Sequence, residues 1–448
     1  MKPPLPMTKI LKKNFSELLV AVDWQDLLLQ GRLYEFESLL FDKIMSLYNS
    51  IAGHFIEQIS EHSKFHQVQR NKASNLGLKK LETRTASVQL RTGKTIKYES
   101  LYAKQKPFNY SGSRHMSHVH WDIMKGASPI YASITCLLSV ICPSFEMSKS
   151  ILRLLGIQTS CSKVRDVALA LGQRCLDERS HIQIDQDESL VGKKVQIAID
   201  GGRTLTREYT DEFTKKGNEK FDAKWREPKM FVITTLDKDG KRDKDNLPLY
   251  DCTFGDDEMM ELLKKNLIKL QIDKADKVQI TADGAPWIWN RVTPMLLSLG
   301  VKMDKITETL DYYHAAEHLH ELRDYIPKEG RETVFEKLKD CLWKGNIKRL
   351  GTLLQKNIPD LDLEDFRPYQ YFQKNNHRID YQYLRMHGSP CGSGVIESAI
   401  RRIINLRFKS PSSFWYPDNV EKLILMRAIA LSGRWKIMLK NLFQNMAS

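Results

Sequence analysis

The chain has 448 residues, 42% of them hydrophobic, and a formal net charge of +14. Its length suits roughly two to four domains with a sizeable apolar core. The seven cysteines are scattered without a CxxC pair, which argues against both a zinc ribbon and a secreted disulfide framework.

The sequence shows no export or membrane signal. Residues 1–24 contain only one short apolar run, LLVAV, which does not make a secretory signal. The longest uncharged stretch, residues 126–145, contains two prolines and several Ser and Thr, so it predicts a buried helix and not a membrane span. We therefore expect a cytoplasmic protein.

The N-terminal part of the chain predicts a helical region, residues 1–69, followed by a basic segment, residues 70–125. The basic segment holds 12 Lys and Arg against 3 Asp and Glu, interleaved with Tyr, Phe and Trp. Basic residues interleaved with aromatic ones favour a surface that binds DNA or RNA over a basic surface that is merely exposed to solvent. His115, His118 and His120 lie there without a fourth ligand at a standard spacing, so their role stays open.

Residues 126–176 are predicted to be helical, with two patterns separated by a glycine and a Ser/Thr-rich turn. Ser160 is the expected N-cap of the second helix. In a helix-turn-helix, Lys163 and Arg165 would begin the recognition helix and reach bases or phosphates, but an ordinary helical hairpin fits the same pattern. The polar stretch 177–190 is predicted to be a linker.

Residues 191–310 predict the first part of an α/β core. In chain order we expect strands near 193–200, 229–236 and 247–254, a helix near 257–271, a strand near 277–282, a helix near 286–299 and a strand near 304–310. This order is typical of an RNase H-like unit, in which the first and fourth strands are neighbours.

Three acids occupy positions that point to chemistry. The runs VQIAI and VQITA end at Asp200 and Asp283, each followed by Gly, so both carboxylates should leave the sheet together. Glu397 falls in the first turn of a helix with Ser393 as its expected N-cap. Taken singly, each acid also suits a turn or a helix dipole, and Glu397 has the spacing for an ion pair with Arg401.

Jointly, Asp200, Asp283 and Glu397 suit a metal-dependent polynucleotidyl transferase. Hard cations such as Mg²⁺ or Mn²⁺ take oxygen ligands, and two ions about 4 Å apart activate the attacking oxygen and stabilise the leaving one. We therefore expect the site to bind two divalent ions. Each phosphoryl transfer should be an in-line displacement at phosphorus, without a covalent intermediate on a side chain.

The remaining sequence predicts an all-helical insertion, residues 311–385, and then the second part of the core with basic helices, residues 386–448. Residues 377–448 hold 11 Lys and Arg against 4 Asp and Glu, whereas residues 191–376 are balanced at 33 of each. Basic surfaces that flank a balanced core are expected if they grip a phosphate backbone.

Five ordered motifs together resemble those of Mutator-like DDE transposases of the bacterial insertion-sequence branch: IAIDGG, TADGAPWI, LDYYHAAEHL, CGSGVIESAIRRIINLRFK and LMRAIALSGRW. The resemblance covers about residues 145–440. It implies that Asp200, Asp283 and Glu397 are the catalytic, metal-binding triad, and that Asp311 and His314 form an auxiliary motif. For the auxiliary pair, a helix-capping Asp with a packed His is an equal alternative.

The resemblance also implies contacts to double-stranded DNA. Four basic residues after the third acid suit phosphates near the cut: Arg401, Arg402, Arg407 and Lys409. Trp415 matches an aromatic of the family that stacks on a base or fills the core. The chain departs from many relatives in lacking paired zinc-binding cysteines near residues 85–125, which puts recognition of DNA ends by a zinc module in doubt.

The implied activity is cleavage of DNA at the element ends and joining of the 3′ hydroxyl to target DNA. Pairing of two ends favours a homodimer or higher oligomer, with the helical residues 17–48 either its interface or part of an intramolecular bundle. Such a protein would associate with the bacterial nucleoid when DNA-bound. Two alternatives remain, a catalytically silent DNA-binding derivative and an RNase H-like nuclease without strand transfer.

Overall fold

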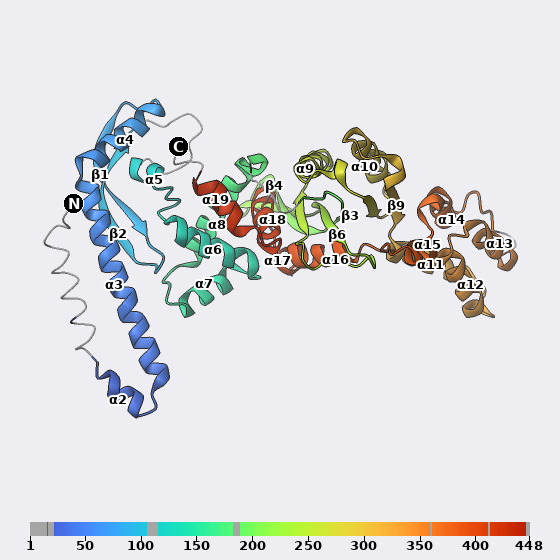
Figure 1. Ribbon diagram of the computed structural model, residues 1–448, viewed down its shortest axis with the longest axis horizontal. Helices are drawn as coiled ribbons and strands as arrows, with labels where there is room; N and C mark the ends of the chain where they lie inside the picture. The colour runs from blue at the N-terminus through green and yellow to red at the C-terminus, as the bar shows by residue number, and fades with distance from the viewer. Residues whose placement is uncertain are drawn as a thin grey trace. The chain divides into compact units, whose positions relative to one another are not determined.

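The computed structural model describes residues 16, 22–104, 115–181, 189–358, 361–410 and 413–444. The chain divides into two compact units, one of Met1–Cys175 with Leu439–Ser448 and one of Leu176–Met438 (Figure 1). The boundary falls beside the predicted end of the helical segment at residue 176. The residues from Leu439 onward, which we expected to belong with the core, group with the first unit.

The first unit is built of helices and one antiparallel strand pair. Its elements are α2 (Trp24–Leu29), α3 (Leu33–Glu61), α4 (Ser63–Asn75), β1 (Leu81–Gln89), β2 (Thr95–Ala103), α5 (Met116–His120), α6 (Pro129–Ile141), α7 (Phe145–Leu154) and α8 (Cys161–Asp177). Strand β2, with the sequence TIKYESLYA, lies inside the predicted basic segment. No described helix is both long and apolar enough to cross a membrane.

The β1–β2 hairpin is shaped by close backbone approaches. Gly93 in its turn has a φ of +85°, and a Cβ there would lie 2.6 Å from the carbonyl oxygen of Gln158. On β2, Ile96 packs against Gly53 of α3, where a Cβ would lie 3.2 Å from Ile96 Cδ1. The long helix α3 can therefore lie against the hairpin, as Figure 1 shows.

The second unit has a mixed five-stranded sheet, which makes it a mixed α/β fold. Its strands, in the spatial order β7-β6-β3-β8-β9, are β7 (Leu249–Thr253), β6 (Lys229–Leu236), β3 (Lys194–Gly201), β8 (Lys277–Ala282) and β9 (Ile306–Leu310). The β3–β6 and β6–β7 pairs are antiparallel, and the β3–β8 and β8–β9 pairs are parallel. All five strands confirm the sequence prediction, and β6 and β8 have the predicted bounds.

Helices cover both faces of this sheet, and those that pack on it or on one another are α9 (Asp256–Lys269), α10 (Pro286–Ser298), α16 (Gly394–Ile400) and α18 (Pro417–Leu431). The chain also forms α17 (Leu406–Phe408) and α19 (Trp435–Gln444), of which the residues from Leu439 onward group with the first unit. Val195, Ile197 and Ile199 of β3 are buried in one apolar cluster with side chains of α9 and α10. Because side chains alternate along a strand, Gln196 and Ala198 face the other side, where α16 packs on β3 (Figure 1). Burial on both faces explains the continuous apolar run.

An all-helical insertion follows β9, as predicted. It comprises α11 (Tyr312–Arg323), α12 (Arg331–Trp343), α13 (Ile347–Asn357), α14 (Arg367–Lys374) and α15 (Tyr381–Met386). The insertion has an apolar core of its own, in which Phe335, Phe372 and Tyr381 are almost fully buried.

In the second unit, one antiparallel ribbon was not predicted. Between β3 and β6 the chain forms an antiparallel ribbon of β4 (Thr204–Phe213) and β5 (Glu219–Arg226). Most of its side chains outside the first residues of β4 are exposed or half-buried. The ribbon begins three residues after Asp200, so it extends from the same end of β3 as that acid.

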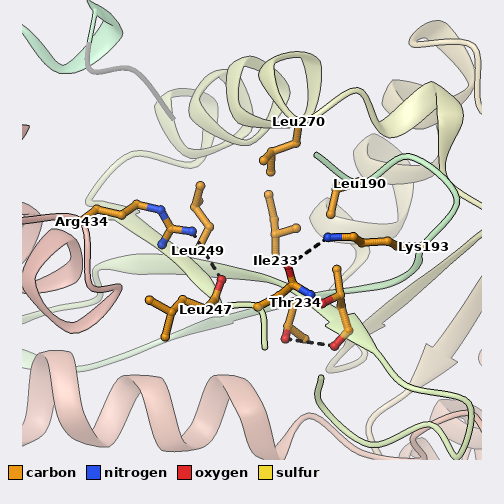
Figure 2. Close-up of a pocket in the computed structure, with 10 residues that line it drawn as sticks. Leu190, Lys193, Ile233, Thr234, Leu247, Leu249, Leu270 and Arg434 are labelled. Atoms are coloured by element: carbon orange, nitrogen blue, oxygen red, sulfur yellow. Dashed lines mark hydrogen bonds between the residues drawn. The ribbon is translucent and has the colours of Figure 1, made fainter. Parts of the chain in front are cut away.

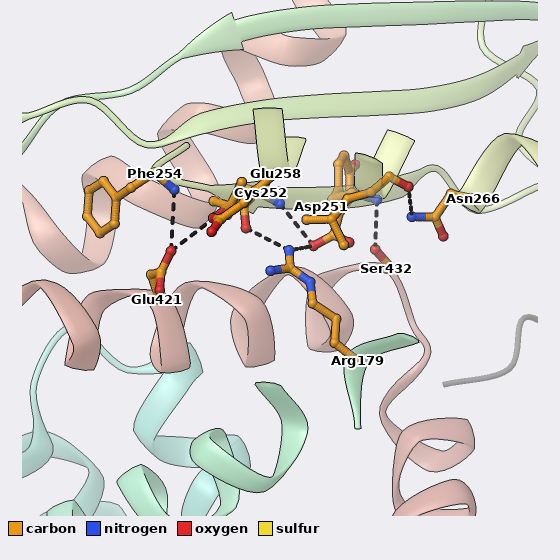
Figure 3. Close-up of polar contacts among 11 residues, drawn as sticks. Arg179, Asp251, Cys252, Phe254, Glu258, Asn266, Glu421 and Ser432 are labelled. Atoms are coloured by element: carbon orange, nitrogen blue, oxygen red, sulfur yellow. Dashed lines mark hydrogen bonds and ion pairs between the residues drawn. The ribbon is translucent and has the colours of Figure 1, made fainter. Parts of the chain in front are cut away.

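A polar network fastens β7 to the segment before the core and to α18 (Figure 3). The Arg179 guanidinium forms an ion pair with Asp251 and donates to the carbonyl oxygen of Cys252 over 2.7 Å. Glu421 of α18 accepts from the Thr253 hydroxyl over 3.0 Å. These side chains are largely buried, so their charges are neutralised by each other and not by water.

A small cavity of about 30 Å³ lies near the start of β3, lined mainly by Leu190, Ile233 and Leu249 (Figure 2). Its cations are already engaged, because Lys193 donates to Asn246 over 2.9 Å and Arg434 to a backbone carbonyl. Lys193 precedes β3 whereas Asp200 ends it. The cavity is therefore a packing gap at the strand end opposite the acids.

Candidate functional site

Three acids stand side by side where three parallel strands end. In the sheet register Ile199 pairs with Ala282, and Ala282 pairs with Leu310. The next residue along each strand is Asp200, Asp283 and Asp311 respectively. The carboxyl ends of neighbouring parallel strands are a common place for a functional site, and here all three carry a carboxylate.

Asp200 is held in a desolvated position. One of its carboxylate oxygens accepts from the Gly201 amide over 2.6 Å. Burial raises the pKa of Asp200 to about 6, and the charges of Asp283 and Glu227 act in the same direction, whereas the Gly201 amide and His314 act against them. A carboxylate with a raised pKa and a carboxylate neighbour is what a cation-binding site produces before the cation arrives.

Asp283 is fixed by the start of α10. Its carboxylate accepts from the Ala285 amide over 2.9 Å, and its carbonyl oxygen accepts from the Trp289 indole over 2.8 Å. Pro286 opens the helix one residue later, where its missing N–H costs nothing. The Asp-Gly turn predicted from the sequence is thus a strand-to-helix turn that holds the acid.

Glu397 follows a loop, residues 390–393, in which every residue makes a backbone hydrogen bond to another part of the unit. Side-chain amides of Gln279 and Gln196 donate to the carbonyl oxygens of Pro390 over 2.6 Å and Gly392 over 3.3 Å. The carbonyl oxygen of Cys391 accepts from the first amide of α11 over 3.1 Å. The amide at residue 393 donates to Asp311. The loop is therefore fastened to the sheet and to the insertion at once.

Asp311 connects α11, the loop 390–393 and the end of β8. It is fully buried, and its carboxylate accepts from the amides of Tyr313 over 2.7 Å and His314 over 3.0 Å, and from that of Ser393. Its own amide donates to the carbonyl oxygen of Ala282, next to Asp283. Asp311 thus caps α11, as its alternative reading expected, and also ties β8 to the loop before α16.

Glu397 follows four residues after this loop, in the first turn of α16. Burial raises its pKa, Asp311 and Glu317 act in the same direction, and His314 acts against them. The expected N-cap Ser393 makes no side-chain cap bond, because its role is to donate its amide to Asp311.

The helix bearing Glu397 is brought to the end of β3 by a close contact. A Cβ on Gly202 would lie 2.5 Å from Ile404 Cδ1, so only glycine permits the approach. Ile404 belongs to a π-helical turn, Arg401–Asn405, that follows α16. Such turns are often found at functional sites.

His314 lies near the charges of both Asp200 and Glu397, because it lowers the pKa of each. Its imidazole is about one third exposed and lies 3.5 Å from a Glu317 oxygen. The five residues predicted for the site, Asp200, Asp283, Asp311, His314 and Glu397, therefore lie within electrostatic reach of one another in pairs.

Sequence reasoning missed three residues of the site. Glu227 stands beside Asp200, where its carboxylate would collide with any Cβ on Gly201, but nothing local marks it. Gln196 and Gln279 were readable, because the same triplet V-Q-I occurs in both strands and the two glutamines pair in register. A polar side chain at the same position of two buried strands indicates a partner on that face.

Oxygen donors suited to a hard divalent cation are present, but they are not gathered into a closed cage. Within the described residues, no three His, Cys, Asp or Glu side chains lie close enough to hold a metal ion. Asp200 and Asp283 fit a shared cation, because their carboxylates leave adjacent strand ends and repel each other. A three-acid site requires Glu397 to approach them.

The basic residues predicted to bind DNA differ in how far their side chains are exposed to solvent. Arg401 and Lys409 are exposed beside α16, as a phosphate contact requires. Arg402 donates to the Tyr250 hydroxyl over 2.8 Å. Arg407 is only 3% exposed, with its guanidinium over the Trp415 ring. The burial of Arg407 argues against a phosphate contact by its guanidinium, whereas Trp415 is half-buried, so both of its predicted roles stay open.

The predicted recognition helix is α8, and its expected N-cap is confirmed, because the Lys163 amide donates to the Ser160 hydroxyl over 3.2 Å. The Lys163 ammonium donates to the carbonyl oxygen of Lys125, and burial lowers its pKa. Arg165 is exposed and paired with Asp166. Of the two predicted contacts, only Arg165 is turned to solvent.

The histidines of the basic segment pack on one another rather than around a metal position. The rings of His115 and His118 lie 5.1 Å apart, and burial lowers the pKa of His118 to about 4. The charge of Lys163 lowers it further. A cationic neighbour disfavours metal binding at this position.

We expect divalent-cation binding to strengthen as the pH rises through about 6, the pKa of Asp200. Only the ionised carboxylate binds a cation, so affinity should change about tenfold per pH unit below that value and level off above it. Titration of Mn²⁺ between about pH 5 and 8 measures this. A profile that is unchanged in Asp200→Asn would contradict the assignment.

Comparisons with known proteins add little. No family model matches the chain, and no curated protein matches it. Among solved structures, the chain is similar to a Drosophila P element transposase strand transfer complex, at 13% identity, covering 72% of this chain and 81% of that one with a TM-score of 0.26. A likeness this slight carries no argument about fold or activity.

Proposed function

We propose that this chain is a metal-dependent DNA transposase of the DDE type, which cleaves DNA at element ends and joins the 3′ hydroxyl to target DNA. The observation that carries the proposal is the row of strand-end acids. Asp200 and Asp283 leave adjacent parallel strands, and the loop four residues before Glu397 is bonded to the same two strands, which supports Glu397 as the third ligand. The bacterial, Mutator-like assignment rests on the sequence motifs alone.

The strand order supports an RNase H-like core. Numbered within the sheet, the five strands run 3-2-1-4-5, the first three antiparallel and the last two parallel to the first. The first and fourth strands of this order carry the first two acids. The insertion α11–α15 lies between the second and third acids, where the motif order of the family expects it.

The acids supply what phosphoryl transfer needs from the protein. Asp200, Asp283 and Glu397 would hold two Mg²⁺ or Mn²⁺ ions, which supply Lewis acidity and activate water when bound. The chain's part would be to hold the ligating carboxylates in position, and Asp200 is already desolvated and next to Asp283. His314, which is partly exposed and whose charge acts on both Asp200 and Glu397, would contact a substrate phosphate.

The β4–β5 ribbon supports a strand-binding role beside the acids. Tyr209 and Tyr416 stack with ring centroids 5.6 Å apart, and the Arg207 guanidinium lies 4.8 Å from the Phe221 ring. Trp225 is 55% exposed. Exposed aromatic rings with interleaved cations are typical surfaces for unpaired bases.

Metal-dependent nicking and strand transfer test the proposal. The substrate is DNA carrying the gene's own flanking ends, with Mg²⁺ or Mn²⁺ and the wild-type chain. We expect nicks at the ends and joined products, both lost when EDTA removes the cations. Nicking without joining would favour a nuclease, and tight binding without nicking under either metal would favour a silent DNA-binding derivative.

A further inference from the structure

A tyrosine from the helical insertion lies against the turn that holds Asp283. Tyr371 belongs to α14, far from β8 in sequence. A Cβ on Gly284 would collide with the Tyr371 ring and stand 3.1 Å from its hydroxyl oxygen. Gly284 directly follows Asp283, so the hydroxyl reaches the backbone beside that acid.

The ring of Tyr371 is held in place, but its hydroxyl is not used. His318 packs on the ring with centroids 4.0 Å apart, and Phe372 lies 5.5 Å away. The hydroxyl oxygen is buried and makes no well-formed hydrogen bond with any described residue. Tyr369, in the same helix, instead donates to the carbonyl oxygen of Ile347 over 3.3 Å.

A buried hydroxyl whose own proton has no acceptor costs stability, so one that persists beside a cluster of acids needs an explanation. Burial raises the pKa of Tyr371, the charges of Asp283 and Asp311 raise it further, and the Gly284 amide acts against them. The hydroxyl proton is thus available to an acceptor, and the nearest charged groups that act on it are the carboxylates of Asp283 and Asp311. One oxygen of Asp283 accepts from the Ala285 amide, and the other has no described donor.

We propose that Tyr371 is a positioning residue for Asp283. Its hydroxyl donates to the Asp283 carboxylate when that group turns toward a bound divalent cation, and fixes its direction. The inference deepens the proposed function and rests on it. It also gives the helical insertion a role in the site beyond carrying Asp311 and His314, because α14 would help to order one of the metal ligands.

Partners that orient a ligating carboxylate typically contribute about 10- to 100-fold to metal affinity or activity. Tyr371→Phe removes the hydroxyl and keeps the ring. We expect Mn²⁺ affinity and the nicking rate of the full chain to fall by about 10- to 100-fold. We expect the melting temperature without metal to stay level or rise, because an unpartnered buried hydroxyl is removed.

Tyr369→Phe is the matched control, since it removes a bonded hydroxyl from the same helix. It should lower the melting temperature slightly and leave Mn²⁺ affinity unchanged. If Tyr371→Phe binds Mn²⁺ and nicks DNA as wild type does, the inference is overturned. A marked fall in its melting temperature with unchanged Mn²⁺ affinity would also overturn it, because the hydroxyl would then be structural.

The two proposals fail in different ways. If wild type nicks DNA, Asp200→Asn does not, and Tyr371→Phe matches wild type, only the role of Tyr371 is lost. If wild type never nicks DNA, the proposed function fails. The Mn²⁺ affinities of wild type and Tyr371→Phe then still decide whether the hydroxyl orders the Asp283 carboxylate.

Discussion

Asp200→Asn should abolish metal-dependent DNA cleavage and, at the same time, stabilise the folded protein near pH 8. The amide keeps the size of the side chain but cannot neutralise a cation, so we expect cleavage to fall by at least about 100- to 1000-fold. This is the largest effect on activity that the site predicts, because Asp200 is a proposed cation ligand whose carboxylate is partly buried beside that of Asp283.

The stability gain follows from the pKa of about 6 for Asp200, against 3.8 without burial. A raised pKa means that the folded state holds the proton more tightly than the unfolded state does. Stability contributed by this group therefore declines as the pH rises from about 4 to 6, and the full penalty persists above that window. Two pKa units correspond to about 3 kcal/mol, and partial solvent access reduces this to about 1–3 kcal/mol.

Urea unfolding in EDTA at about pH 8 and about pH 4 measures this penalty. Asp200→Asn should exceed wild type in unfolding free energy at the higher pH and match it at the lower one. Asp222→Asn, which changes an exposed carboxylate on β5, is the control and should alter neither stability nor cleavage. Full cleavage by Asp200→Asn would remove Asp200 from the site.

The core strands could be predicted because strands that are buried on both faces are rich in apolar and β-branched residues. β6 and β8 are buried strands of this composition, and charged or turn-forming residues flank them, so their limits follow from local pattern. The β4–β5 ribbon has no buried face to impose a pattern along its length, and runs such as EYTDEF and EKFDAKWR therefore resemble loops. Its strand pairing is an interaction between two polar segments that periodicity does not reveal.

The acids of the site could be predicted from the sequence, but the residues that hold them in place could not. Asp200 and Asp283 follow recognisable strands, whereas the docking of residues 390–393 depends on partners far away in the chain, Gln196 among them. For Arg407 the sequence suggested a function that its burial contradicts. A basic residue after the third acid suggests a phosphate contact, but its guanidinium is buried over Trp415, and only the packing of the helices determines that.

Asp311→Ala should destabilise the second unit more than any other single change at the site. The substitution leaves three backbone amides without their acceptor, a buried one at Ser393 and two partly buried ones at Tyr313 and His314. Each buried donor left unsatisfied costs about 1–3 kcal/mol, and partial relaxation makes a total of about 3–5 kcal/mol reasonable. Because the Ser393 bond joins the insertion to the loop before α16, we also expect Glu397 to lose its placement and cleavage to fall.

Two comparison variants separate this linking role from ordinary helix capping. Asp380 caps α15 with a single amide bond of 3.0 Å and is exposed, so Asp380→Ala should cost only about 1 kcal/mol and leave cleavage intact. Asp311→Asn keeps one acceptor oxygen for the α11 cap and loses the second, so it should lie between wild type and Asp311→Ala in unfolding free energy. If Asp311→Ala costs no more than Asp380→Ala, the carboxylate is a helix cap alone, and Glu397 is placed by other contacts.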